Sequence, residues 1–231
     1  MSRLFTFGCS FTKYKWMTWA DILGMQYNEY YNYGYTGAGN VYIFGRFITA
    51  LAKHKINKDD TVMIMWTNVM REDRFICNNW HLYGNIYTQD FYPKEYIEKY
   101  VDEKGFYERD MPLLHAAQVI LDGLGCNHHI MSMVDMTSPD QYKHGNPLQN
   151  IDHLLELYSD TLNRIKPSVH KVIFNYEYQS RPTPGRSIRK DNHPTPLEHL
   201  EYLEKVIPNI SLNEEIIDKV KKENIKVILS L

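Results

Sequence analysis

The chain has 231 residues, with 26 Lys and Arg against 28 Asp and Glu, and only three cysteines. A net charge of −2 argues against a protein that holds nucleic acid through its phosphates, because that binding needs a basic surface. Three widely spaced cysteines indicate neither a disulfide framework nor a zinc site.

The hydropathy pattern argues against a membrane protein. No apolar run approaches the roughly 20 residues that span a bilayer, and the N-terminus lacks the pattern of a signal peptide. We therefore expect a soluble, cytoplasmic protein whose partners are neither nucleic acid nor membrane.

The first part of the chain alternates between strand and helix patterns. Residues 3–8 (RLFTFG) form a short apolar run that is typical of a buried strand. Residues 16–24 predict a helix. The tyrosine-rich run 27–33 predicts a strand, followed by a loop with several glycines. Apolar residues at helical spacing predict a helix over 41–55.

Two more strand patterns lie in the middle of the chain, at 61–66 (TVMIMW) and 129–134 (HIMSMV). The first is continuously apolar, as buried parallel strands are. Between them, residues 68–92 are polar, aromatic and irregular, and residues 93–104 predict a short charged helix. A segment of this kind is expected to be an insertion that builds a lid or a binding wall. An amphipathic helix is expected at 108–124.

The last part of the chain contains helix patterns, strand patterns and one long loop. In chain order these are a helix at 150–166, a strand at 171–176 (KVIFNY), a loop rich in Pro and Arg at 179–196, helices at 197–206 and 212–223, and a last strand at 225–229.

Short apolar strands that alternate with helices indicate a three-layer α/β/α sandwich with a mostly parallel, five-stranded sheet. The sequence contains no internal repeat and no linker. We therefore expect a single domain over residues 1–231, with an insertion at about 69–107.

Polar residues that can carry chemistry follow the predicted strands. In an open parallel sheet, ligands bind outside the carboxyl ends of the strands. Ser10 follows the first strand, a glycine-rich loop at 32–40 follows the second, and Asn68 follows the third. Asp191 and His193 precede a late helix.

An acyl-transfer site needs these residue types. A hydroxyl attacks, an imidazole takes its proton, and a carboxylate holds the imidazole in the correct tautomer. Backbone N–H groups and a side-chain amide stabilise the oxyanion, and each donor often contributes about 3–4 kcal/mol.

Four sequence blocks, in this order and at these places relative to the strands, resemble those of the SGNH hydrolases, also called GDSL-type esterases. GCS (8–10) is similar to the family's GDS block, NYGYTG (32–37) to NxGxxG, WTNV (66–69) to GxND, and DNH (191–193) to DxxH. The resemblance implies the SGNH form of the α/β/α sandwich, which is flavodoxin-like.

The resemblance also implies a role for each block residue. Ser10 would be the nucleophile, His193 its general base, and Asp191 the carboxylate that orients His193. The N–H groups of Ser10 and Gly37 and the side-chain amide of Asn68 would form the oxyanion hole. No cofactor and no metal is implied.

Two of the blocks depart from the family in residue type. Cys9 replaces the aspartate of GDS, a position that is not catalytic. Trp66 and Val69 replace the glycine and the aspartate of GxND. Losing that aspartate alters how Asn68 is held, and the bulky Trp66 is expected to narrow the pocket as a substrate-binding residue.

The last block departs in spacing, since D-x-H is one residue shorter than D-x-x-H. In an extended chain, residues two apart lie about 6.6 Å apart. Asp191 therefore reaches His193 only if the loop bends. Otherwise Asp191 is a surface residue, and His193 acts alone or with another orienting group.

Arginines near the blocks allow two interpretations. Arg71 and Arg74 either pair with nearby carboxylates, or one of them recognises an anionic or sugar substrate at the mouth of the site. Arg181, Arg186 and Arg189 allow the same two interpretations, and a solvated basic loop is the default.

Tyrosine is unusually frequent, with 18 residues against 9 Phe and 4 Trp. Its apolar ring and polar tip suit half-wet surfaces such as clefts. The excess is either compositional drift or a surface that faces a saccharide or a protein partner. Several tyrosines fall in or near the loops that would wall the site, namely Tyr14, Tyr33, Tyr35, Tyr83 and Tyr87. Of these, Tyr35 is a candidate for substrate binding.

The favoured function is ester hydrolysis through a covalent acyl intermediate on Ser10. The expected partner is a small-molecule ester, and a short acyl group on a carbohydrate is preferred over a lipid. Two alternatives stay open: an acyltransferase that uses the same site, and a non-catalytic SGNH-fold module, because a fold alone does not fix a function.

Overall fold

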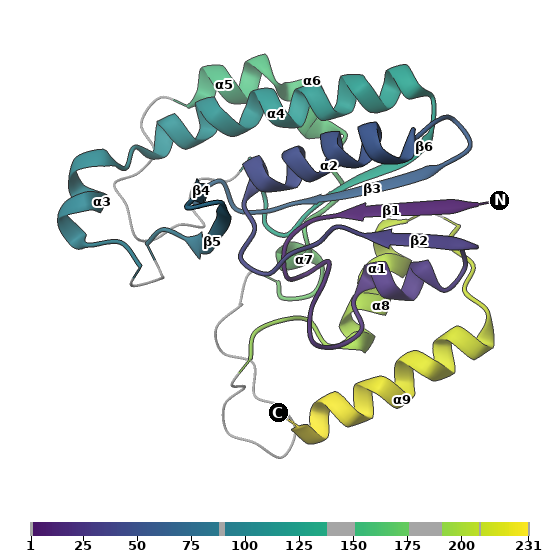
Figure 1. The fold of residues 1–231 in the computed structure, drawn as a ribbon. Coiled ribbons are helices and arrows are strands. Elements are labelled where there is room, and N and C mark those ends of the chain that lie inside the picture. The colour runs from purple at the N-terminus through teal and green to yellow at the C-terminus, as the bar shows by residue number, and fades with distance from the viewer. Residues whose placement is uncertain (1, 88–90, 138–150, 176–190, 208, 231) are drawn as a thin grey trace.

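The computed structural model describes all residues except 1, 88–90, 138–150, 176–190, 208 and 231. At its centre lies a four-stranded parallel sheet in the order β2-β1-β3-β6 (Figure 1). These strands are β1 (Arg3–Phe7), β2 (Glu29–Asn32), β3 (Thr61–Trp66) and β6 (Asn127–Ser132). Every residue of β3 is buried, as its continuous apolar run predicts for a central parallel strand.

Helices cover both faces of the sheet (Figure 1). α2 (Asn40–His54) and α4 (Glu103–Leu124) pack together over one face. α1 (Trp19–Gly24) and α8 (Pro196–Val206) lie over the other, and α9 (Glu214–Ser230) packs outside α8. The prediction of an α/β protein with a parallel sheet between layers of helices is confirmed.

Two predicted strands are wrong. Residues 169–172 form the short helix α7 (Val169–Val172), which Ser168 caps by accepting the N–H of Lys171. The run 171–176 therefore begins in a helix, and residue 176 lies outside the described part of the chain. The buried Ile173 and Phe174 explain the error, because a short buried apolar run has the same composition in a strand or a helix.

The run 225–229 lies inside α9 and continues its helix. The buried residues Val220, Asn224 and Val227 recur at helical spacing. Within the described residues the sheet therefore has four strands, where the sequence predicts five.

The insertion predicted at about 69–107 contains an antiparallel hairpin that no strand pattern in the sequence indicated. It consists of β4 (Arg71–Ile76) and β5 (Asn79–Asn85), joined by Cys77 and Asn78. Both joining residues have positive φ, of 52° and 61°, as a two-residue hairpin turn needs.

The remaining helices differ from prediction mainly at their ends. α4 begins at Glu103, five residues before the predicted start at 108. The predicted helix 150–166 is divided into α5 (Asp152–Leu157) and α6 (Ser159–Asn163), and α3 (Lys94–Tyr100) follows the hairpin. No helix in the described ranges is long and apolar enough to cross a membrane.

Candidate active site

Ser10 lies in a tight turn just beyond the carboxyl end of β1. A side chain at Gly8 would clash with Oγ1 of Thr12, so the chain packs too closely there for any residue but glycine. The carbonyl of Cys9 then accepts the N–H of Thr12 at 2.9 Å, which closes the turn. Cys9 itself is fully buried, and its sulfur lies 3.8 Å from that of Met133.

The structure brings Ser10, His193 and Asp191 together in a hydrogen-bonded series. Nε2 of His193 lies 2.8 Å from Oγ of Ser10, and Nδ1 lies 2.8 Å from Oδ1 of Asp191. With a carboxylate at Nδ1, the neutral imidazole carries its proton there. Nε2 is then an acceptor for the Ser10 hydroxyl, as a general base must be.

The shortened D-x-H spacing works because the chain bends at this point. The backbone N–H of His193 donates to Oδ1 of Asp191 at 3.0 Å, which closes a local turn around the carboxylate. The same oxygen accepts from the imidazole. The condition that the spacing imposes on Asp191 is therefore met.

The other carboxylate oxygen of Asp191 is held from the serine loop. Oδ2 accepts the hydroxyl of Tyr14 at 2.7 Å and lies 3.0 Å from Nζ of Lys15. Burial by itself would raise the pKa of Asp191, but the hydrogen bonds from the backbone of His193, from Tyr14, from Lys15 and from the imidazole outweigh it. The pKa therefore lies well below its ordinary value, and the carboxylate is ionised at neutral pH.

Three N–H donors at the carboxyl edge of the sheet have no acceptor among the residues that the structure describes. They are the backbone N–H groups of Ser10 and Gly37 and the side-chain amide of Asn68. Oδ1 of Asn68 accepts the N–H of Met70 at 2.7 Å, which fixes the orientation of the amide. These are the donors that the sequence blocks assign to an oxyanion hole.

The hairpin β4–β5 fixes the loop that carries Gly37. Gly37 has φ of 80°, and a side chain there would clash with the carbonyl of Leu82 in β5. The N–H of Gly84 donates to the carbonyl of Gly37 at 3.1 Å. The predicted insertion thus packs directly against one of the candidate oxyanion loops.

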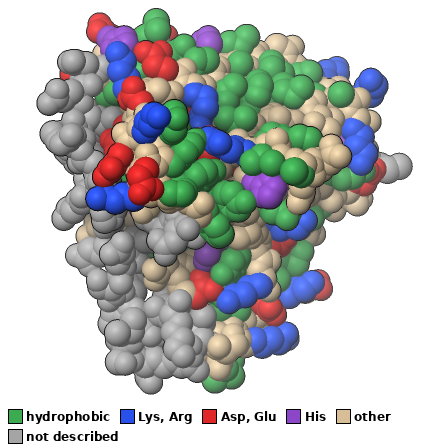
Figure 2. Space-filling view, turned by 60° about the vertical axis from the view of Figure 1, so that its left-hand side comes forward, with side chains coloured by type: hydrophobic (Ala, Val, Ile, Leu, Met, Phe, Trp, Pro, Cys, Tyr) green, Lys and Arg blue, Asp and Glu red, His purple; other side chains and the backbone are tan. Residues whose placement is uncertain are grey.

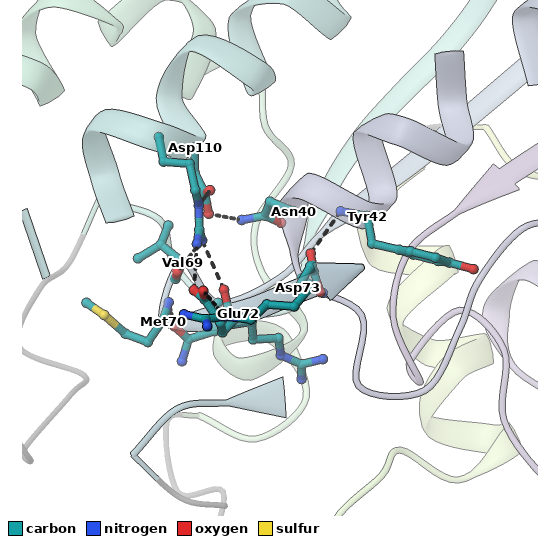
Figure 3. Close-up of polar contacts among 12 residues, drawn as sticks. Asn40, Tyr42, Val69, Met70, Glu72, Asp73 and Asp110 are labelled. Carbon is teal, nitrogen blue, oxygen red and sulfur yellow. Dashed lines mark hydrogen bonds and ion pairs between the residues drawn. The ribbon is translucent and has the colours of Figure 1, made fainter. Parts of the chain in front are cut away.

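A buried polar network holds the other candidate oxyanion loop, which carries Asn68 (Figure 3). The side chain of Asn40 accepts the N–H of Thr67 at 2.9 Å and donates to its carbonyl at 3.1 Å. It also donates to Asp110 of α4 at 2.8 Å. Arg109 donates to Asp110 at 2.6 Å and to the carbonyl of Val69 at 2.9 Å. Hydrogen bonds therefore hold the loop on both sides of Asn68, at Thr67 and at Val69, although Val69 replaces the family's aspartate.

No pattern in the sequence indicates this network. Asp110 is fully buried, and burial raises its pKa to about 6 although Arg109 and Asn40 both donate to it. Neighbouring charges at the start of an amphipathic helix are ordinary, so Arg109 and Asp110 gave no signal in the sequence.

The candidates for substrate binding have different environments. Trp66 is fully buried in the core, so its side chain exposes no surface to a substrate in this structure. Arg74 pairs with Glu72 at 3.0 Å. Arg71 donates to the carbonyl of Ala38 at 2.9 Å and pairs with no carboxylate among the described residues.

The carboxyl edge of the sheet and the hairpin lie toward the side that comes forward in Figure 2, where hydrophobic side chains gather between charged ones. Tyr35 is 56% exposed, and its ring centre lies 5.9 Å from that of Tyr42. Arg181, Arg186 and Arg189 lie outside the described residues.

Comparison with known proteins gives matches at the level of structure. No family model and no curated protein matches the sequence. A member of the lipolytic G-D-S-L family from Veillonella parvula has a TM-score of 0.48 and 14% identity, over 91% of this chain and 100% of that one. Axe2, an acetylxylan esterase from Geobacillus stearothermophilus, has a TM-score of 0.44 and 12% identity, over 91% and 95%. The psychrotrophic esterase EstA from Pseudoalteromonas sp. has a TM-score of 0.44 and 11% identity, over 87% and 94%. These three structures, a lipolytic protein of the G-D-S-L family and two esterases, are similar to this chain over most of its length, at low sequence identity.

Proposed function

We propose that this chain is a serine ester hydrolase that works through an acyl intermediate on Ser10. The observation that supports the proposal best is the hydrogen-bonded series from Ser10 through His193 to Asp191, in which both distances at the imidazole are 2.8 Å. The base lies within hydrogen-bond reach of both the nucleophile and the orienting carboxylate, as acyl transfer to a serine requires.

In the first half-reaction, Oγ of Ser10 attacks the ester carbonyl carbon while its proton passes to Nε2 of His193. The carbonyl oxygen becomes an oxyanion and accepts hydrogen bonds from the N–H groups of Ser10 and Gly37 and from Asn68. The ionised Asp191 stabilises the imidazolium. The bond to the alcohol oxygen then breaks, and Nε2 gives its proton to the leaving alkoxide.

In the second half-reaction, His193 takes a proton from water, and the hydroxide attacks the acyl carbon. The oxyanion forms again among the same three donors. When it collapses, the bond to Oγ breaks, Ser10 regains its proton from His193, and the carboxylic acid leaves. No cofactor enters either step.

We further infer that the substrate carries a short acyl group on a carbohydrate. The support is the excess of tyrosine in the loops around the site, because Tyr has an apolar ring and a polar tip that suit a half-wet cleft. The half-exposed Tyr35 lies in the same loop as Gly37 and is the residue we assign to this contact.

A fluorophosphonate probe tests the proposal. Such a probe reacts with an activated serine, so mass spectrometry of the labelled protein should place one adduct on Ser10. Ser10→Ala should give no adduct and no turnover of p-nitrophenyl acetate. A folded wild-type protein that is not labelled would contradict the hydrolase and favour a non-catalytic module.

A second measurement distinguishes hydrolysis from acyl transfer. Turnover is followed with and without sugar acceptors, and the products are separated. Free acid as the main product in both cases is the result expected of a hydrolase. Acylated sugar as the main product would identify a transferase on the same residues.

A further inference from the structure

We propose that Tyr14 is a positioning residue that holds both His193 and Asp191 in their reactive arrangement. The inference rests on the proposed esterase function. Tyr14 belongs to none of the four sequence blocks, and it lies 177 residues from Asp191 in the chain.

Tyr14 touches the two residues through different parts of its side chain. Its ring stacks on the imidazole of His193, with ring centres 3.8 Å apart and planes 16° from parallel. Its hydroxyl donates to Oδ2 of Asp191 at 2.7 Å. One rigid side chain therefore fixes both the plane of the imidazole and the position of the carboxylate.

The shortened D-x-H turn explains why this support is needed. Oδ1 of Asp191 already accepts two hydrogen bonds, from the backbone N–H and from the imidazole of His193. Both come from the turn itself, and no hydrogen bond from the turn reaches Oδ2 among the described contacts. Oδ2 is held by Tyr14 and Lys15, which follow the loop of Ser10.

The neighbouring residues have smaller roles at this contact. The side chain of Lys15 is 61% exposed, so solvent and salt screen its ion pair with Asp191. The buried Trp16 donates from Nε1 to the carbonyl of Pro194 at 2.7 Å, which anchors the backbone beyond His193. Phe11 and Trp16 also lie edge-on to the imidazole, with ring centres at 5.5 and 6.4 Å. Among these described neighbours, only Tyr14 contacts both the imidazole and the carboxylate.

Tyr14 should act more strongly in the transition state than in the resting enzyme. When Nε2 takes the Ser10 proton, His193 becomes a cation, and the negative face of an aromatic ring attracts a cation. The Tyr14 hydroxyl is a neutral donor, so it fixes Asp191 without opposing that positive charge. Loss of Tyr14 should therefore lower kcat more than it raises KM.

Two substitutions separate the ring from the hydroxyl. Tyr14→Phe keeps the stacked ring and removes one oxygen atom, and we expect kcat to fall about tenfold with KM within about twofold of wild type. Tyr14→Leu removes both contacts and should lower kcat by a further factor of about ten. The partial recovery from Leu to Phe measures the contribution of the ring.

Tyr31→Phe is the matched control. Its ring also stacks on an aromatic residue, Phe5, with centres 4.8 Å apart, and its hydroxyl also donates to a carboxylate, that of Glu29 at 2.6 Å. This pair lies in β2, where Glu29 is at the end of the strand away from the site. Tyr31→Phe should leave kcat and KM unchanged.

The measurements are esterase turnover, fluorophosphonate labelling at Ser10, and the thermal midpoint of each variant. A Tyr14→Phe variant with wild-type kcat and labelling rate would overturn the inference and leave the esterase intact. An unlabelled wild-type Ser10 would instead contradict the proposed function, and with it the role of Tyr14. If Tyr14→Leu fails to fold, Tyr14→Phe decides the question alone.

Discussion

Asp191 receives donors on both carboxylate oxygens, and this arrangement explains how a carboxylate two residues from a histidine can serve it. One oxygen faces the backbone and ring of His193, and the other faces Tyr14 and Lys15. Each of these groups donates a hydrogen bond to Asp191. The site therefore requires a side chain that only accepts, which an ionised carboxylate does.

The substitution Asp191→Asn tests that requirement. An amide has one donor end and one acceptor end, so its NH2 group must face either His193 or the donors Tyr14 and Lys15. If the NH2 group faces His193, the imidazole must accept at Nδ1 and takes the wrong tautomer. If the NH2 group faces Tyr14 and Lys15, it meets two groups that themselves donate hydrogen bonds. We expect kcat to fall by about two to four orders of magnitude. Turnover of p-nitrophenyl acetate at a fixed pH measures the loss.

Asp122→Asn provides the control for this substitution, because Asp122 pairs with Arg164 at 2.6 Å on the surface. Its kcat should match that of wild type. Unimpaired turnover in Asp191→Asn would show that Asp191 does not orient His193, even if Ser10 remains the nucleophile.

The buried Asp110 gives a prediction about stability and pH. Burial raises its pKa from 3.8 to about 6, so the folded protein holds a proton on this group more tightly than the unfolded chain does. The contribution of Asp110 to the free energy of unfolding is therefore full below about pH 4 and is lost as the pH rises to about 6.

Urea unfolding of wild type and Asp110→Asn at pH 4 and pH 7 checks the sign. The stability of wild type relative to the variant should be greater at pH 4 than at pH 7, because the amide that replaces the carboxyl group does not titrate. An equal difference at the two pH values would contradict the raised pKa of Asp110.

Single residues differed in how well the sequence revealed them. Ser10, Gly37, Asn68 and His193 stand at strand ends in short blocks, and the structure brings Ser10 and His193 into hydrogen-bond contact. Tyr14 gave only a weak signal, because its partners come from a distant turn. A local sequence pattern does not predict the contact between Tyr14 and Asp191, because it is formed only when the chain folds.

At the scale of elements, the hairpin β4–β5 joins the sheet to the candidate oxyanion loops. Arg71 donates to the carbonyl of Ala38 at 2.9 Å. Asp73 accepts the N–H groups of Gly39 and Tyr42, at 2.7 and 2.8 Å. Asp73 thereby caps α2, whose own N-cap is a glycine without a side chain. The hairpin is therefore part of the site's framework.

Gly37→Ala tests this close packing. A methyl group at φ of 80° is strained, and here it would also clash with the carbonyl of Leu82. We expect the free energy of unfolding to fall by about 1–3 kcal/mol. We also expect kcat to fall, because the loop must shift its N–H. Urea unfolding and steady-state turnover measure the two effects.

Gly45→Ala is a control with the opposite expected sign. Gly45 lies in the interior of α2, and a Cβ there would meet no atom within 4 Å. Alanine should stabilise the protein by about 0.5–1 kcal/mol, because glycine is the weaker helix former. If both variants lost stability equally, the packing of the hairpin on Gly37 would not be the cause.

The elements also show where sequence patterns are ambiguous. The central run 61–66 was predicted correctly, because a continuous apolar segment there must be buried on both faces. The runs 171–176 and 225–229 have similar composition and begin in or belong to helices. In those segments the secondary structure depends on the capping residue and on the packing partners. Ser168 caps α7, and Val227 lies on the buried side of α9.

At the scale of the whole molecule, distant parts of the sequence meet at the turn that carries Asp191 and His193. The loop after β1 supplies Trp16, the turn supplies Pro194, and α9 supplies Val227, which packs against Trp16 in a small cluster apart from the main core. Asn224 of α9 also accepts the N–H of Leu197 at 3.2 Å, at the start of α8. α9 therefore supports the turn that carries His193, through its contacts with Trp16 and with the start of α8.

This arrangement predicts that a change in α9 reaches the site. Val227 is 5% exposed, and Val227→Asp would place a charge against Trp16, where it has little water. The Trp16 anchor on Pro194 should loosen, and the position of His193 with it. We expect kcat to fall about tenfold, which corresponds to about 1.4 kcal/mol, in the upper range for the loss of a neutral hydrogen bond such as that from Trp16 to Pro194.

Ile225→Asp is the control on the same helix, because Ile225 is 59% exposed and its substitution leaves the cluster intact. Hydrogen exchange followed by mass spectrometry gives the decisive measurement. In Val227→Asp, exchange should rise in the segments around residues 10–16 and 191–196 and stay at its wild-type level in β3. Faster exchange throughout the sheet would mean general destabilisation of the protein, and would contradict a specific support of the His193 turn by α9.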